Sequence, residues 1–249
     1  EQPQQNILKH IGQYAYNLNS LLGKGYSSSV YKGTQKVTQE PAQSLMKAAI
    51  KVIVLQSVRG DIPRGLLSNE LRALKQLSHG NVIRTHDICQ TANNMYIVSE
   101  FCNQGDLLGV LRKGLTEEQA YDLSDDCRRH GVRQLKGIVH RDIKPANILL
   151  RDSVAKICDF GFCGFLQNQQ QSFIAENFSV GSPLYMSPEA YRRNHYSVKS
   201  DVWAAGITLY EMLIDSNRSK DELRHVGEIS YGGTQVSEGR GLHTLSTFE

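Results

Sequence analysis

The chain has 249 residues, of which 40% are hydrophobic and 21% are charged, a balance that is typical of globular proteins. Its formal net charge of +3 is too small to indicate a nucleic-acid partner, and its basic residues form no long tract. The five cysteines do not have the spacing of a disulfide framework, which indicates reduced intracellular thiols. No apolar run reaches membrane-spanning length, and the first residues lack signal-peptide character. We therefore expect a cytoplasmic protein, with the nucleus left open, that has no membrane segment and no nucleic-acid partner.

The first part of the chain is expected to form a small sheet with one helix. Residues 1–13 are polar and are expected to fray. Runs rich in apolar, β-branched or aromatic residues predict strands over 16–22, 29–33, 47–54, 82–89 and 95–102. Leucines at three- and four-residue spacing form one apolar face and predict a helix across Leu67, Leu71, Leu74 and Leu77.

The second part of the chain turns helical after a hinge that we place near Glu100–Gly105. It passes through a charged loop and reaches an apolar helix predicted over 201–213. The predicted fold class is α+β, in two lobes. The predicted domains are a tail over 1–13, a small lobe over 14–102, a large lobe over 103–214 and an atypical segment over 215–249.

A glycine turn with a lysine downstream indicates phosphate binding in the first lobe. Gly23-Lys24-Gly25 can bring backbone amides close to anionic oxygens, although a plain hairpin turn explains this pair of glycines equally well. Lys51 lies within the buried run 47–54 and needs a carboxylate partner, because a partly buried lone charge is costly. Glu70 on the predicted helix fits that partner; the alternative is two unrelated surface charges.

The charged loop carries the residues that favour a chemical function. It holds Asp142, Lys144 and Asn147 between apolar runs, and Asp159 follows the next apolar run. Two carboxylates, one ammonium and one amide can hold a divalent cation, orient a hydroxyl and neutralise a migrating phosphoryl group. A solvated loop with scattered charges is the alternative, and it does not account for the order of these residues.

The sequence from Val139 to Leu150 (VHRDIKPANILL), followed by Asp159-Phe-Gly, resembles the catalytic loop and metal-binding motif of eukaryotic protein kinases. The lysine two residues after Asp142 resembles the residue that serine/threonine kinases have at this position. The order of the motifs resembles that of autophagy-type and related signalling kinases. The resemblance implies a bilobal fold with a five-stranded small lobe bearing one helix and a mainly helical large lobe. It also implies transfer of the γ-phosphate of ATP, with Mg²⁺, to a serine or threonine hydroxyl of a protein substrate.

The same resemblance implies roles for individual residues. Asp142 would orient the attacking hydroxyl and Lys144 would stabilise the γ-phosphate. Asn147 and Asp159 would bind Mg²⁺. The residues expected to bind ATP are Leu22, Gly23, Lys24, Gly25, Val30, Ala49, Lys51, Glu70, Ser99, Glu100, Cys102 and Leu149. Ser99 would be a small gatekeeper that leaves a pocket behind the adenine.

Arg141 precedes Asp142, and in this family that pattern goes with phosphorylation of the activation segment, here residues 159–189. An arginine beside the loop would bind the phosphate through two hydrogen bonds. Ser172 and Ser179 are the candidate acceptors, and an upstream activating kinase is an expected partner.

Four further residues are expected to support the loop. Ser182 resembles the threonine that hydrogen-bonds the catalytic aspartate and lysine in the family. Asp201 matches the start of the helix that anchors the loop. His140 and Phe160 are expected to pack in the interior and not to react.

Two stretches depart from the family pattern. Residues 122–131 carry charges on every face where an amphipathic helix should support the loop. Residues 215–249 read as polar where the family continues with further helices, so the large lobe looks truncated. Both stretches have abrupt edges, which leaves an error in the gene model open as an explanation.

These departures leave two alternatives to an active protein kinase. One is a catalytically silent nucleotide-binding scaffold, and the other is a small-molecule kinase of the same fold. The intact set of Lys51, Asp142, Asn147 and Asp159 favours the enzyme. Residues 181–189, which resemble a peptide-substrate platform, count against the small-molecule kinase.

Overall fold

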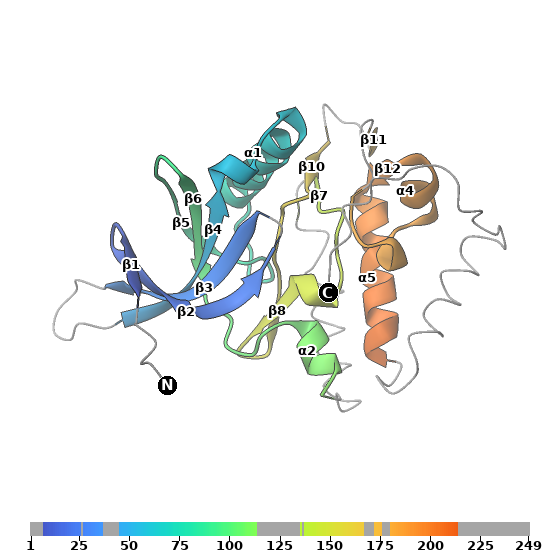
Figure 1. Ribbon diagram of the computed structural model, residues 1–249. Helices are drawn as coiled ribbons and strands as arrows, with labels where there is room; N and C mark the ends of the chain where they lie inside the picture. Colours follow the sequence, from blue (N-terminus) through green and yellow to red (C-terminus); the bar gives the residue numbers. More distant parts are fainter. Residues whose placement is uncertain are drawn as a thin grey trace, which may run out of the picture. The chain divides into compact units, whose positions relative to one another are not determined.

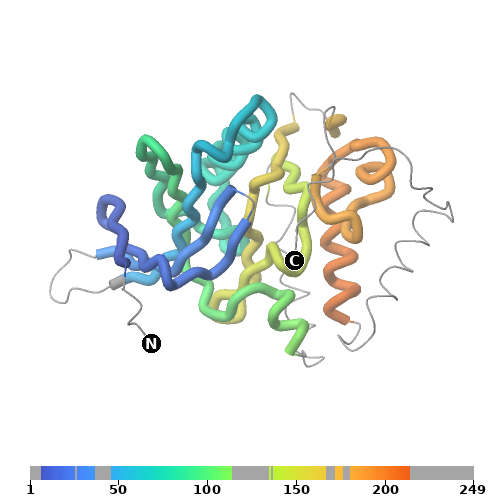
Figure 2. The backbone as a smooth tube through the Cα atoms, in the orientation of Figure 1, coloured from blue at the N-terminus to red at the C-terminus, as the bar shows by residue number. Residues whose placement is uncertain are grey.

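A computed structural model describes residues 7–25, 27–36, 45–113, 135, 137–166, 172–175 and 180–213, and Figure 2 follows their backbone. The chain divides into two compact units. Unit 1 consists of Glu1–Leu67 and Ile83–Asn103, and unit 2 of Ser68–Val82 and Gln104–Glu249. Each unit has its own hydrophobic core.

Unit 1 is built on a six-stranded antiparallel sheet with the strand order β1-β2-β3-β4-β6-β5 (Figure 1). Alternate residues of a strand point to opposite faces, and one face carries a core of Tyr14, Tyr16, Ala48, Ile50, Tyr96 and Val98. The strands are β1 (Leu8–Ile11), β2 (Tyr14–Lys24), β3 (Ser28–Lys36), β4 (Leu45–Val54), β5 (Thr85–Gln90) and β6 (Asn94–Glu100).

Strand β1 corrects two expectations, because it makes six strands where five were predicted and it lies within residues expected to fray. It pairs with β2 through a turn at Gly12, whose positive φ of 53° suits glycine. Three of its four residues are exposed and only Ile11 is half-buried. Backbone hydrogen bonds therefore hold this edge strand, and they leave no hydrophobic pattern in the sequence.

Gly33 on β3 is fixed by close packing between neighbouring strands. A Cβ atom at this position would lie 2.5 Å from Cδ1 of Ile50 and 2.8 Å from the backbone oxygen of Ala15. Both neighbours belong to the sheet, and Ile50 is fully buried in the core. Only glycine fits here without a shift of strand or side chain.

Helix α1 (Asp61–Gln76) contains the predicted leucine face and begins earlier than predicted. It starts beyond Gly60 with Asp61 in its first turn and has Lys75 in its last turn, which complements the helix dipole at both ends. A short 3-10 helix, Leu55–Ser57, connects β4 to it. The helix buries Glu70, Ala73 and Leu74.

Unit 2 combines two-stranded sheets with short helices and one longer helix (Figure 1). Its paired strands are β8 (Ile148–Arg151) with β9 (Val154–Ile157), β7 (Ile138–Val139) with β10 (Gly164–Phe165), and β11 (Ser172–Ile174) with β12 (His195–Ser197). Besides residues 68–76 of α1, the helices in the described part of unit 2 are α2 (Leu107–Leu111), α4 (Pro188–Arg193) and α5 (Val198–Leu213), with 3-10 turns at Pro145–Asn147 and Pro183–Tyr185.

The core of unit 2 joins elements that are distant in sequence. Leu107 and Leu111 of α2 pack with Ile148, Leu150 and Ala155 of the β8–β9 hairpin and with Met212 of α5. The α5 helix confirms the predicted apolar helix and begins at Val198. The anomalous stretches 122–131 and 215–249 lie outside the described residues, so the predicted truncation stays a prediction.

We expect Gly33→Ala to lower the free energy of unfolding by about 1–3 kcal/mol, because overpacking displaces neighbouring atoms. Urea unfolding followed by circular dichroism measures the change. Gly65→Ala is the matched control, since a Cβ there meets nothing within 4 Å on helix α1, and alanine should stabilise that helix by roughly 0.5–1 kcal/mol. Equal effects of the two variants would contradict the close packing at Gly33.

Candidate functional site

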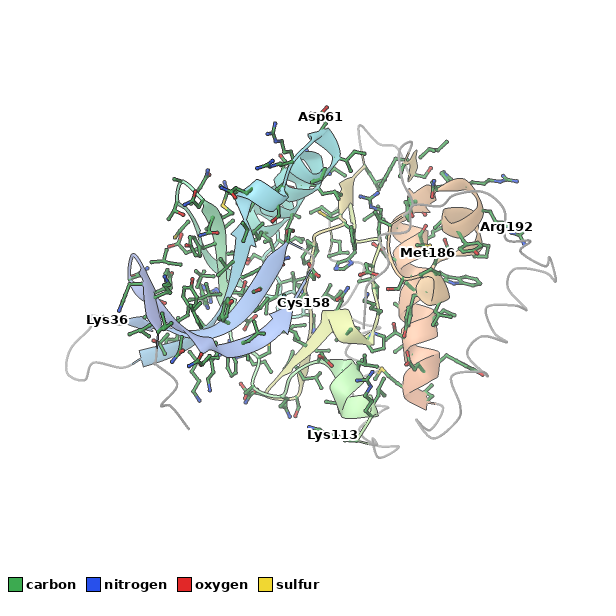
Figure 3. All side chains as sticks on the ribbon, in the orientation of Figure 1. Lys36, Asp61, Lys113, Cys158, Met186 and Arg192 are labelled. Atoms are coloured by element: carbon green, nitrogen blue, oxygen red, sulfur yellow. The ribbon has the colours of Figure 1, made fainter. Side chains whose placement is uncertain are left out.

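The β8–β9 hairpin brings the two predicted metal ligands to one end of unit 2. Asn147 directly precedes β8, and Asp159 follows the end of β9 by two residues. Ile148 pairs with Ile157, and the N–H of Cys158 donates to the carbonyl oxygen of Asn147 at 3.0 Å. Cys158 is labelled in Figure 3. Strand pairing thus places the Asn147 and Asp159 backbones side by side.

The Asn147 side chain is oriented by its own loop. Its Nδ2 donates to the backbone oxygen of Asp142 at 2.8 Å and to Asp142 Oδ2 at 2.8 Å. This use of the nitrogen leaves Oδ1 as the ligand atom. Among the described residues, no cluster of three or more His, Cys, Asp or Glu side chains could hold a metal ion. An amide oxygen with one carboxylate fits Mg²⁺, which takes few protein ligands and completes its shell with water and phosphate oxygens.

Asp142 lies at the centre of a hydrogen-bond network and is 6% exposed. Its Oδ1 accepts from the backbone N–H of Ser182 at 2.9 Å and from the Ser182 hydroxyl at 3.0 Å. Lys144 Nζ lies 3.1 Å from Asp142 Oδ2 and donates to Ser182 Oγ at 2.7 Å. The contacts predicted for Ser182 are therefore present, and they fix the carboxylate and the ammonium beside each other.

Asp201 anchors the charged loop from within the protein. It is 1% exposed, and its two oxygens accept the backbone N–H groups of His140 at 2.6 Å and Arg141 at 2.9 Å. Burial raises the pKa of the Asp201 carboxyl, and the hydrogen bonds from the two backbone groups oppose that shift. The predicted anchoring role of Asp201 is thus visible as two hydrogen bonds.

His140 and Phe160 pack in the interior, as predicted. Both side chains are fully buried, and their ring centroids lie 4.8 Å apart at an edge-to-face angle. The His140 ring is hydrogen-bonded through Nε2 to the Cys158 carbonyl oxygen at 3.0 Å, and its Nδ1 accepts from the N–H of Asp142 at 3.2 Å. The histidine thus ties the charged loop to the end of β9.

Helix α1 contacts the start of the activation segment inside unit 2. Asn69 donates to the Cys163 carbonyl oxygen at 3.3 Å, and the Arg72 guanidinium lies 4.0 Å from the Phe165 ring centroid. A Cβ atom placed on Gly161 would lie 3.9 Å from Oε2 of the buried Glu70. Glu70 therefore lies near the Asp159-Phe-Gly turn.

Most residues predicted to bind ATP lie in unit 1. Gly23 and Lys24 end β2 opposite Val30 and Ser29 of β3, and the N–H of Gly25 donates to the Ser28 carbonyl oxygen at 2.8 Å. The glycine turn is therefore a hairpin, which is compatible with both interpretations of its sequence. The predicted binding residues of unit 1 are Leu22, Gly23, Lys24, Gly25, Val30, Ala49, Lys51, Ser99, Glu100 and Cys102.

Strands β4 and β6 carry further residues of unit 1 that were predicted to bind ATP. Lys51 lies opposite Val30, and Ala49 lies opposite Ser99, which is half-buried. The Glu100 carboxylate is buried and accepts the N–H of Arg84 at 2.9 Å. Glu70 and Leu149 belong to unit 2. The Lys51–Glu70 ion pair and the convergence of both groups on one nucleotide stay predictions.

The described cysteines agree with reduced thiols. Cys89, Cys102, Cys158 and Cys163 take part in no disulfide bond. Burial raises the pKa of the Cys163 thiol to about 12, so this thiol stays protonated and unreactive at neutral pH. Cys127 lies outside the described residues.

Within the described part of the chain no helix is long and apolar enough to cross a membrane.

The structure also shows contacts that the sequence did not predict. Tyr185 donates its hydroxyl to Glu211 Oε2 at 2.7 Å, which ties the segment before α4 to α5. Arg141 lies against the rings of Phe173 and Tyr196. Of the candidate phosphorylation sites, Ser172 lies on β11, and Ser179 lies outside the described residues. No sequence pattern marks Phe173 or Tyr196 as partners of Arg141.

Comparison with known proteins identifies relatives over most of the chain. The protein kinase domain family matches residues 16–230. Serine/threonine-protein kinase atg1 of Dictyostelium discoideum is 38% identical over 220 residues, which cover 83% of this chain and 31% of the relative. Serine/threonine-protein kinase ULK1 of Homo sapiens is 32% identical over 222 residues, covering 82% and 20%. Serine/threonine-protein kinase unc-51 of Caenorhabditis elegans is 34% identical over 229 residues, covering 83% and 25%.

These matches confirm the resemblance drawn from the motifs, including its serine/threonine type and its likeness to autophagy-type kinases. The chain spans between about a fifth and a third of the length of these relatives. The likeness therefore concerns the matched domain and not the remainder of the relatives.

We expect Asp201→Asn to lower the free energy of unfolding by about 1–3 kcal/mol, because the amide nitrogen would face a buried N–H and leave it without an acceptor. Urea unfolding measures the change. Asp152→Asn is the matched control, since the Asp152 side chain is 71% exposed and surface changes usually stay within about 0.5 kcal/mol. If both variants unfold alike, the anchor has no energetic importance.

Proposed function

The chain belongs to the protein kinase family, and on that premise we propose that it transfers the γ-phosphate of ATP to a serine or threonine hydroxyl of a protein substrate. The observation that carries the proposal is the Asp142 network. It holds the Lys144 ammonium and the Asn147 amide within hydrogen-bonding distance of the Asp142 carboxylate, and Ser182 fixes the ammonium further. Such preorganised charge suits phosphoryl transfer, which depends mainly on positioning and electrostatic stabilisation.

Each residue of the network would act at a different atom of the reaction. Asp142 would accept the hydrogen bond of the attacking hydroxyl and take up its proton. The Lys144 ammonium, 2.7 Å from Ser182 Oγ, would bind an oxygen of the γ-phosphate. Asn147 Oδ1 and Asp159 would hold Mg²⁺, which would supply positive charge to offset that of the phosphate.

The nucleotide would be bound by the residues of unit 1. The β2–β3 hairpin at Gly23-Lys24-Gly25 would lie over the phosphates, and Lys51 would neutralise their charge. The described cysteines, which form no disulfide bond, support a reducing location, which we propose to be the cytoplasm, with the nucleus left open. The substrate would be a protein and not a nucleic acid.

We expect Asp142→Asn to lower kcat by about 100-fold or more, because an amide cannot accept the proton of the hydroxyl. Transfer of radiolabelled phosphate from ATP to a generic protein substrate, with Mg²⁺, measures this loss. Asp152→Asn removes an exposed carboxylate from the same unit and should retain full activity. Equal turnover by Asp142→Asn and the unmodified chain would remove the proposed role of Asp142.

A second experiment separates the enzyme from a catalytically silent nucleotide-binding scaffold. A ligand at 100 times its Kd stabilises the folded state by roughly 2.7 kcal/mol. Mg-ATP should therefore raise the melting temperature of the chain, and Asp159→Asn should abolish the part of the shift that requires Mg²⁺. Thermal shift without turnover would support the scaffold, and the absence of any shift would contradict nucleotide binding.

A further inference from the structure

We propose that the sheet of unit 1 carries a docking surface for a short acidic peptide segment of a partner protein. The surface consists of Lys32 and Lys36 on strand β3 and Lys47 on strand β4, and we call it the lysine face. None of the three lysines is among the residues predicted to bind ATP. The inference therefore goes beyond the proposed phosphotransfer and does not rest on it.

Positive charge is concentrated in unit 1. Residues 1–67 and 83–103 contain nine lysines and arginines but five aspartates and glutamates, which gives a formal net charge of +4. The other residues of the chain hold 19 basic and 20 acidic side chains, so they are close to neutral. An imbalance of charge between two parts of a chain indicates an anionic partner for the basic part.

The strand register brings the three lysines together on one face of the sheet. Lys47 lies opposite Thr34, and Lys32 and Lys36 lie two residues before and after Thr34 on the same strand. Residues two apart on a strand point to the same face, so both are diagonal neighbours of Lys47. Diagonal neighbours lie about 7–8 Å apart. Three positive charges therefore share a small area of the surface.

The lysine face is opposite to the face that carries the core of unit 1. Ala48 directly follows Lys47 and is fully buried in that core, and neighbouring residues of a strand point to opposite faces. All three lysines are exposed to solvent, and Lys36 is labelled in Figure 3. Their ammonium groups are therefore accessible to a partner.

No carboxylate in the described part of the chain neutralises these ammonium groups, because none lies within ion-pair distance of the three lysines. Lys32 Nζ lies 5.3 Å from the ring centroid of Phe101, a contact that attracts the cation but leaves its charge in place. Like charges at neighbouring positions of a sheet repel one another. An anionic segment bound across the lysine face would relieve this repulsion.

The composition of the lysine face favours a peptide over other polyanions. Proteins that bind single-stranded nucleic acids combine positive charge with aromatic rings on which bases stack, whereas Phe101 is half-buried and contacts Lys32. Binding to an anionic membrane typically uses clusters of roughly four to eight lysines and arginines. The three ammonium groups of the lysine face match a short segment with two or three carboxylates.

The first test measures binding of a probe peptide to the full 249-residue chain. The probe is a fluorescein-labelled peptide of eight glutamates, and fluorescence anisotropy at low ionic strength gives its Kd. We expect the triple variant Lys32→Gln, Lys36→Gln, Lys47→Gln to weaken binding by about tenfold, the combined loss of three exposed ion pairs. A labelled peptide of eight glutamines should not bind. The inference fails if the unmodified chain does not bind the glutamate peptide.

A second triple variant controls for net charge. Lys9→Gln, Arg59→Gln and Arg64→Gln remove three positive charges from exposed positions of unit 1 outside the lysine face. We expect the Kd of this variant to stay within about threefold of that of the unmodified chain, because distant surface charges are screened by salt. Circular dichroism checks that both triple variants fold. Equal loss of affinity in the two variants would overturn the inference, since binding would then follow net charge alone.

The same proteins distinguish a peptide from the other polyanions. Vesicles that contain phosphatidylserine and a short oligouridine are each titrated with the unmodified chain and with both triple variants. We expect the two triple variants to bind vesicles alike and to bind oligouridine alike, because the lysine face contributes no specific contact to either. A stronger effect of the lysine-face variant on vesicles or oligouridine than on the glutamate peptide would contradict the proposed partner.

A last variant separates the lysine face from the predicted nucleotide site. Lys51 lies on the same strand and face as Lys47, four residues further on, but it is half-buried. We expect Lys51→Gln to bind the glutamate peptide within about twofold of the unmodified chain, as for a residue outside the contact surface. Loss of peptide binding in Lys51→Gln would place the peptide at the nucleotide site and overturn the inference. Absence of phosphotransfer in every form would leave the inference standing, because the readout is binding.

Discussion

The buried carboxylate of Asp201 is the constraint on which the rest of the site depends. Two successive N–H groups, those of His140 and Arg141, point inward and need acceptors, and a single carboxylate satisfies both. Removing that charge from water is costly, so the arrangement is stable only because both oxygens are used. Once the backbone is fixed at these residues, Asp142 is directed toward Ser182 and Asn147. The position of the Asp142 network is thus set by hydrogen bonds to a buried carboxylate.

Elements from different parts of the chain position the residues of the site. The β8–β9 hairpin brings Asn147 and Asp159 together through strand pairing alone. The position of Asp142, by contrast, depends on Ser182 and Asp201, which come from later parts of the chain. Helix α1 adds contacts to the segment after Asp159 through Asn69 and Arg72. The residues proposed as cation ligands, base and phosphate-binding lysine are therefore positioned by different elements of unit 2.

Much of the site could be predicted from the sequence, because the loop and the residues that support it follow a family pattern. The Ser182 and Asp201 contacts were anticipated and are present. Strand β1 was missed because its residues, most of them exposed, do not alternate between apolar and polar types. The contacts of Arg141 with Phe173 and Tyr196 were missed because the pairing of those two residues joins segments far apart in sequence. Register of that kind depends on tertiary packing, which local propensity does not encode.

The short span of the β8–β9 hairpin has a consequence for the order of folding. Contacts between residues close in sequence form quickly, because little chain entropy is lost in closing the loop. Such contacts join Asn147 and Asp159. The hydrogen bonds of Asp201, in contrast, require helix α5 to pack against the loop at His140 and Arg141. We therefore expect the Asn147–Asp159 end of the site to form early in folding and the position of Asp142 to be fixed late. A chain that loses the support of α5 would keep its cation ligands adjacent while releasing Asp142.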